Sequence, residues 1–118
     1  MRLERVSALL KIEISRILRV TINDPKIGFI SIIEVKLSKD LGIAKVFYSQ
    51  IGTEKEKEET LERLKKVRGV IKGELGRVLH LKTIPNLRFV FDPSLEKGAD
   101  LVNKINQLNI HKAKNQDA

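Results

Sequence analysis

Apolar and polar residues recur with two different periods along the chain, and these periods predict its elements. Over residues 2–20 the apolar positions are spaced three and four apart, which is typical of an amphipathic helix. Residues 31–38 and 43–51 favour β-strands, the first by its alternation and the second by its β-branched and aromatic residues. Only "KDLG" separates the two strands, so we expect an antiparallel hairpin.

A second helical pattern begins with a predicted capping box. In it the side chain of Thr53 accepts a hydrogen bond from the backbone N–H of Glu56, and the side chain of Glu56 accepts one from the backbone N–H of Thr53. Its apolar stripe continues through the glycine-rich stretch "LKKVRGVIKGELGRVLH". Gly69 follows a turn rich in Lys and Arg, where a left-handed glycine commonly ends a helix. Because the stripe resumes at once, we predict a kink at Gly69 between two helices, with the amino end of the second exposed. We expect Gly73 and Gly76 to let that helix lie close to a sheet.

A third strand is predicted at residues 87–92, after Pro85, and a final amphipathic helix at residues 95–108. The order of elements is helix, strand, strand, helix, helix, strand, helix. This order predicts an α+β domain in which one layer of helices covers a three-stranded sheet. We expect the domain to span residues 1–110, and the polar residues 111–118 to form a frayed tail.

Composition narrows the classes of partner. The 118 residues carry a formal net charge of +8 and include no cysteine, which excludes disulfides and Cys-ligated zinc. The first residues are too charged for a signal peptide and no apolar run could span a bilayer, so we expect a cytoplasmic protein. A basic domain of this size favours a polyanion, most often nucleic acid. Aromatic residues make up only 4%, which argues against base stacking as the main mode of RNA recognition.

Basic residues are densest in residues 64–80, which carry five cations and one anion. Cations beside a helix start, with glycine allowing the backbone to come close, suit RNA phosphates better than base edges. Lys45 and Arg88 are weaker candidates, because charges on an exposed sheet face are usually only solvated. The predicted RNA-binding residues, including three on the first helix, are Lys65, Lys66, Arg68, Gly69, Lys72, Arg77, Arg2, Arg5 and Lys11.

Other classes of function fit the sequence less well. His80 and His111 are the only histidines, and no metal-ligand spacing or catalytic motif is present, so we expect no enzyme, metal or cofactor. "GELG" at residues 73–76 matches the letters of the K-homology GxxG loop, but it falls inside a predicted helix and Glu74 would repel phosphate. Three alternatives stay open: a membrane- or helix-binding segment over residues 61–80, a stable ribosomal protein, and a generic RNA-binding protein.

Five separated motifs, in this order, resemble the bacterial ribosome-binding factor A family over about residues 2–108. The motifs are "RLERV" (2–6), "INDPKIG" (22–28), "LSKDLGIAKVF" (37–47), "GVIKGELGRVLHLKTIPNLRFVFD" (69–92) and "SLEKG" (94–98). The resemblance implies a type II K-homology-like fold, in which a kink bearing Ala-x-Gly replaces the phosphate-clamping GxxG loop. The matching triplet here is Val67-Arg68-Gly69, with valine in place of alanine.

The resemblance also implies a function: binding of the free small (30S) ribosomal subunit as an assembly factor. In the family this assists late maturation of 16S rRNA near its 5′ end and is associated with growth in the cold. We expect a monomer that contacts no membrane and takes no small-molecule substrate. Asp24, Asp40 and Asp92 match family positions, but their places beside proline and turn residues favour local hydrogen bonds over a functional role.

Overall fold

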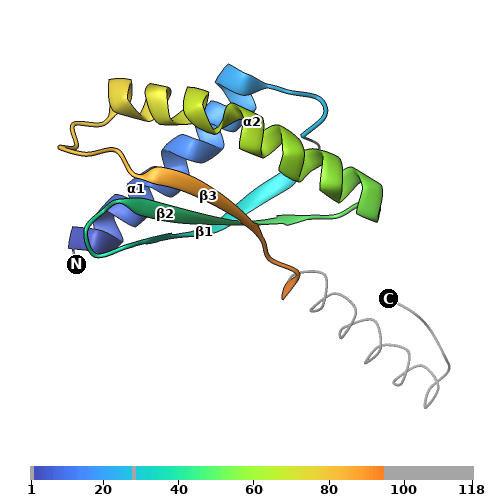
Figure 1. Cartoon of the computed structure of the whole chain (residues 1–118), viewed down its shortest axis with the longest axis horizontal. Coiled ribbons are helices and arrows are strands. Elements are labelled where there is room, and N and C mark those ends of the chain that lie inside the picture. The colour runs from blue at the N-terminus through green and yellow to red at the C-terminus, as the bar shows by residue number, and fades with distance from the viewer. Residues whose placement is uncertain (1, 28, 95–118) are drawn as a thin grey trace, which may run out of the picture.

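The computed structural model describes residues 2–27 and 29–94. In this part of the chain two helices, the first of which ends in a π-helical segment, pack on a three-stranded sheet (Figure 1). The predicted α+β class is confirmed, whereas the K-homology-like relationship stays a prediction. The helix predicted over residues 95–108 and the tail at residues 111–118 lie outside the described residues. The elements are α1 (Arg2–Arg16), η1 (Ile17–Ile22), β1 (Ile30–Leu37), β2 (Ile43–Gln50), α2 (Glu54–Val78) and β3 (Asn86–Phe91).

The sheet has the strand order β1-β2-β3. β1 and β2 form the predicted antiparallel hairpin, and β3 lies parallel to β2 because α2 crosses between them. Ala44, Val46 and Tyr48 on β2 are buried, while the alternate residue Lys45 is exposed. The helices therefore cover one face of the sheet, and within residues 2–27 and 29–94 no element covers the other face.

A β-bulge interrupts the regular alternation of β1. Ile32 pairs with Tyr48 and Glu34 with Phe47, so Ile33 is the extra residue. Before the bulge, Ile32 packs against the core, and after it the buried side chain is Val35. Plain alternation over residues 31–38 would put Ile33 on the same face as Val35, and the bulge is the reason that it does not hold there.

The hydrophobic core lies between the two helices and the sheet. The side chains of Leu10 and Ile14 on α1, and of Leu64 and Leu75 on α2, are fully buried, which confirms the predicted apolar stripes. Burial of each such side chain stabilises the fold by about 1.5–3 kcal/mol. Val78 was predicted to continue the stripe but is 41% exposed, because α2 ends there.

The first helix departs from its predicted geometry at the carboxyl end. Residues 17–22 form a π-helix rather than the end of an α-helix and the start of a loop, and Asn23 ends it in a left-handed conformation with φ 44°. The N–H of Asn23 donates to the carbonyl oxygen of Leu18 at 3.0 Å, a bond that spans five residues. The wider turn allows the consecutive residues Ile17 and Leu18 both to be buried.

The segment predicted as two helices around Gly69 is a single helix. α2 is helical at every residue from Glu54 to Val78, and Gly69 is not left-handed. Figure 1 shows that the axis of α2 bends near its middle, but the helix continues through the bend. Leu64, Ile71 and Leu75 are fully buried in one core, so tertiary packing holds the helix together across the glycines. The prediction of a second, exposed helix amino end is therefore wrong.

The amino end of α2 is formed as predicted. Thr53 Oγ1 accepts a hydrogen bond from the backbone N–H of Glu56 at 3.1 Å, and the N–H of Thr53 donates to Glu56 Oε1 at 2.7 Å. The backbone bond from Thr53, and then its hydroxyl, hold the pKa of the Glu56 carboxyl below its usual value. This capping box fixes the residue at which α2 begins. It thereby contributes to which side of the helix each cation farther along faces.

Candidate nucleic-acid interface

Three of the predicted cations lie on one edge of α2. Lys65, Arg68 and Lys72 are spaced three and four residues apart, so they share a helix face. The Nζ of Lys72 donates to the side-chain oxygen of Asn86 at 2.7 Å, which directs this edge toward β3. Arg68 Nε donates to the carbonyl oxygen of Lys65 at 3.3 Å, and both side chains are exposed. The structure thus brings these three cations together.

Two other predicted cations of α2 point elsewhere. The helical spacing places Lys66 and Arg77 on the solvent side, away from the edge that faces β3. The Nη1 of Arg77 forms an ion pair with Glu74 at 2.6 Å, which reduces its attraction for an external anion. Lys66 is exposed and forms no ion pair within residues 2–27 and 29–94. Lys66 is therefore the better of these two candidates.

A second group of cations crosses the outer face of the sheet. Lys36 on β1 pairs in register with Lys45 on β2, and Lys45 pairs with Arg88 on β3. All three side chains are exposed, and like charges directly opposite one another destabilise a sheet. Lys36 lies over the ring of Phe47 with its Nζ 5.4 Å from the centroid. A row of this kind is stabilised by an external anion.

Sequence reasoning ranked Lys45 and Arg88 low and did not include Lys36. Each residue alone is an ordinary solvent-facing position on a strand. Only the strand register places the three charges side by side, and that register depends on the bulge in β1 and on the parallel pairing of β3.

The two groups of cations meet at the edge strand β3. Asn86, which accepts the hydrogen bond from Lys72, begins this strand, and Arg88 lies two residues farther on the outer face. We use the term basic band for the cations that run from α2 across β3 to β1. Its members are Lys65, Arg68, Lys72, Arg88, Lys45 and Lys36.

The predicted cations of the first helix divide between two places. Lys11 and Lys36 line the same shallow groove between α1 and β1, so Lys11 extends the basic band beyond β1. Arg5 is exposed on α1, and no contact joins it to the band among the described residues. The backbone of Arg2 is part of α1, but its side chain lies outside the described part of the structure.

Two glycines of α2 lie on its exposed side with bare backbone. A Cβ added to Gly69 or Gly73 would meet nothing within 4 Å, so the expectation that Gly73 provides close packing is wrong. A Cβ at Gly76 would lie 3.7 Å from Ile84, an ordinary contact that also needs no glycine. The backbone at Gly69 and Gly73 is consequently open to an approaching partner next to the cations of α2.

The predicted local hydrogen bonds of the three aspartates are confirmed. The carboxyl of Asp40 accepts from the Ser38 hydroxyl at 2.7 Å and from the Gly42 N–H at 2.9 Å, and these bonds lower its pKa. The carboxyl of Asp92 accepts from the N–H of Ser94 at 2.8 Å. These two carboxylates organise turns.

Asp24 combines a local role with a long-range one. It accepts from the N–H of Lys26 at 2.9 Å and from Arg63 Nε at 2.8 Å, and the two bonds lower the pKa of its carboxyl. Arg63 lies on α2, 39 residues away, so sequence spacing contained no signal for this ion pair. The pair fixes the loop before β1 to the helix.

Other site chemistry is limited in the described part of the chain. Residues 2–27 and 29–94 contain no group of three His, Asp or Glu residues that could hold a metal ion. His80 is exposed beyond the end of α2, and His111 lies outside the described residues. Over the same described ranges, no helix is both long and apolar enough to cross a membrane.

Comparisons with a family profile and with individual relatives point to the same protein family. The sequence profile described as "Ribosome-binding factor A" matches residues 2–105. A relative named "Ribosome-binding factor A" from Dictyoglomus thermophilum is 43% identical over 110 residues, covering 92% of each chain. One from Staphylococcus carnosus is 41% identical over 108 residues, covering 92% of this chain and 94% of the relative.

Solved structures agree in fold. The crystal structure of ribosome-binding factor A from Thermus thermophilus superposes with a TM-score of 0.67 at 23% identity, covering 75% of this chain and 93% of that one. A Thermus thermophilus ribosome-binding factor A homology model, fitted into a cryo-electron microscopy map of a 30S complex, gives 0.60 at 24% identity. It covers 74% of this chain and 91% of that one.

Proposed function

This chain belongs to the ribosome-binding factor A family, and we propose that it binds free small (30S) ribosomal subunits while they are being assembled. The relative fitted into a 30S map supports this choice of partner. In this proposal the protein assists late maturation of 16S rRNA near its 5′ end and then leaves the finished subunit. It acts by binding alone, as a monomer, and needs no cofactor or catalytic step.

The basic band is the observation that carries the proposal. Its cations come from α2, β3, β2 and β1 and are linked by the hydrogen bond of Lys72 to Asn86 and by the strand register. The bare helix backbone at Gly69 and Gly73 lies beside the cations of α2. Phosphates of folded rRNA fit such a surface, because backbone contacts depend on charge and approach rather than on base edges. If about six phosphates are neutralised, the logarithm of affinity falls with the logarithm of salt concentration with a slope of about −4 to −5.

Co-sedimentation with purified free small subunits and with joined ribosomes, over a salt series, tests the proposal. The variant Lys65→Gln/Arg68→Gln/Arg88→Gln removes three exposed charges of the basic band. The matched control Lys39→Gln/Lys55→Gln/Lys82→Gln has the same net charge, but its three sites are exposed and lie off the band. We expect the first variant to bind more weakly with a salt slope flatter by about 2, and the control to bind like the wild type.

The outcomes separate this proposal from its rivals. Equal binding to joined ribosomes would indicate a stable ribosomal protein, and a flat salt response would refute electrostatic binding to rRNA phosphates. Equal losses in the two triple variants would mean that net charge, rather than the band, governs binding. Flotation with anionic liposomes would indicate a membrane-binding segment instead.

A further inference from the structure

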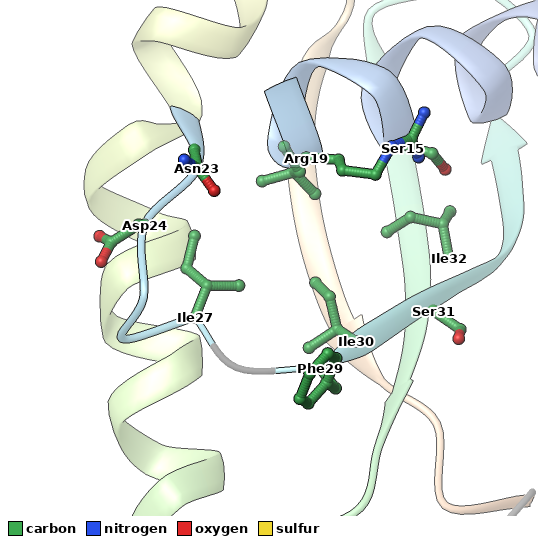
Figure 2. Close-up of a pocket in the computed structure, with 10 residues that line it drawn as sticks. Ser15, Arg19, Asn23, Asp24, Ile27, Phe29, Ile30, Ser31 and Ile32 are labelled. Carbon is green, nitrogen blue, oxygen red and sulfur yellow. The ribbon is translucent and has the colours of Figure 1, made fainter. Parts of the chain in front are cut away.

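A pocket separate from the basic band opens between the end of the first helix and the start of β1. Figure 2 shows Arg19 and Asn23 above this pocket and Phe29 below it. The cavity has a volume of about 530 Å³, within the range of sites that bind small organic groups. Leu18 and Ile27, both buried, contribute apolar surface to its wall.

The polar side of the pocket has one cation that pairs with no other described residue. Arg19 is exposed on the π-helix η1, and its side chain forms no hydrogen bond or ion pair within residues 2–27 and 29–94. The carboxylate that lines the pocket, Asp24, is already paired with Arg63 at 2.8 Å. In Figure 2 the side chain of Arg19 extends toward Ser15 and Asn23 lies on the other side of the view, so the pocket presents a free guanidinium and an amide on two sides of its apolar wall.

Contacts to α2 hold the pocket in shape. Besides the ion pair of Asp24, the hydroxyl of Thr60 donates to the carbonyl oxygen of Ile27 at 2.8 Å. Thr60 is completely buried and also accepts from the side-chain nitrogen of Gln50 at 2.7 Å. These bonds hold residues 24–27, which form one wall of the pocket, against α2.

Phe29 is the unusual residue of this region. Its side chain is 97% exposed, although aromatic rings are among the costliest groups to leave in water. None of the ring contacts within residues 2–27 and 29–94 involves Phe29; those of Phe47, Tyr48, Phe89 and Phe91 lie within the sheet or against α2. The fold itself gives Phe29 no role, and its ring face is free beside the pocket.

We propose that this pocket binds one unpaired nucleotide of rRNA, with its base stacked on Phe29 and its phosphate at Arg19. The inference rests on the proposed function, since it specifies a second contact with the same RNA. A base has two apolar faces and a polar edge, which match the ring of Phe29, the apolar wall and the amide of Asn23. Stacking on one aromatic residue is compatible with the small aromatic content of the chain.

The main competitor for this surface is a protein partner. Ile51 is 90% exposed and lies one step beyond the last hairpin pair, Ile30–Gln50, at the same end of the sheet as Phe29. A stable protein contact needs about 800 Å² on each side with a largely apolar centre. A free guanidinium and an amide at the pocket, in a protein of charge +8, favour RNA instead.

The test measures affinity for purified free small subunits over a salt series with three variants. Phe29→Ala removes the ring, Phe29→Tyr retains it, and Ile51→Ala removes the neighbouring apolar side chain. We expect Phe29→Ala to lose about 5- to 150-fold in affinity, the range for one base-stacking aromatic, with an unchanged salt slope. Phe29→Tyr and Ile51→Ala should bind within about twofold of the wild type. Thermal melts check folding, which these exposed positions should not affect.

A benzophenone amino acid placed at position 29 identifies the partner by photo-crosslinking to the bound subunit. A crosslink to 16S rRNA together with the loss in Phe29→Ala supports the proposal. Wild-type affinity for Phe29→Ala, equal losses in Phe29→Ala and Ile51→Ala, or a crosslink only to ribosomal protein would overturn it. If the wild type itself fails to bind small subunits, the proposed function fails, and the pocket proposal fails with it.

Discussion

Replacing Gly69 and Gly73 by alanine should stabilise this protein, and the reason lies in the continuity of α2. Both residues are helical, neither is left-handed, and a Cβ at either position would meet nothing within 4 Å. Alanine is favoured over glycine in a helix interior by about 1 kcal/mol, so the double variant should gain about 2 kcal/mol. With the entropy of unfolding expected for a chain of this size, that is a rise of about 8 °C in melting temperature.

Urea and thermal unfolding followed by circular dichroism at helical wavelengths provide the assay. Gly52→Ala is the matched control, because a Cβ there would lie 2.8 Å from Glu56 Oε1, an atom already engaged in the capping box. We expect no gain from that control. A loss of stability in Gly69→Ala/Gly73→Ala would refute the reasoning, since it would indicate a backbone at these residues that alanine cannot adopt, as in the left-handed kink.

Two further predictions concern stability. Thr60→Val should cost about 1–3 kcal/mol in urea unfolding, because the carbonyl of Ile27 loses its donor and the buried side-chain nitrogen of Gln50 loses its acceptor; an unchanged midpoint would contradict that network. Asp40 and Glu56 have lowered pKa values in the fold, so they contribute stability above about pH 4 that is lost as pH falls through those values. Urea midpoints measured from pH 6 to pH 2 should decline, and the decline should be smaller in Asp40→Asn.

Local rules were sufficient for much of the fold. The hairpin, the capping box and the apolar stripes of both helices depend on residues a few positions apart, and these predictions are confirmed. The predicted break into two helices at Gly69 was wrong for the opposite reason. Glycine propensity is a local and weak signal, and burial of Ile71 and Leu75 in the same core as Leu64 overrides it. Propensity could indicate a weak point, but not whether packing would hold the helix across it.

The candidate site was less accessible from the sequence, because its parts lie far apart in the chain. Density of charge drew attention to Lys65 and Arg68, which lie with Lys72 on one edge of α2. The row from Lys36 to Arg88 required the register of three strands, and no spacing rule contains that register. The density of basic residues along the sequence identifies cations that lie on one helix. It does not identify cations from different strands that come together only in the folded sheet.

The exposed glycines and the basic band now require one explanation. Glycine at Gly69 and Gly73 lowers the stability of α2 and supports no packing in the described structure, so the fold alone does not account for it. Bare backbone beside cations lets a phosphate chain come closer than any side chain would allow. If Gly69→Ala/Gly73→Ala is more stable and yet binds small subunits more weakly at an unchanged salt slope, close approach is the function of the glycines. If affinity is retained, the cations of the band suffice, and the glycines contribute nothing to recognition.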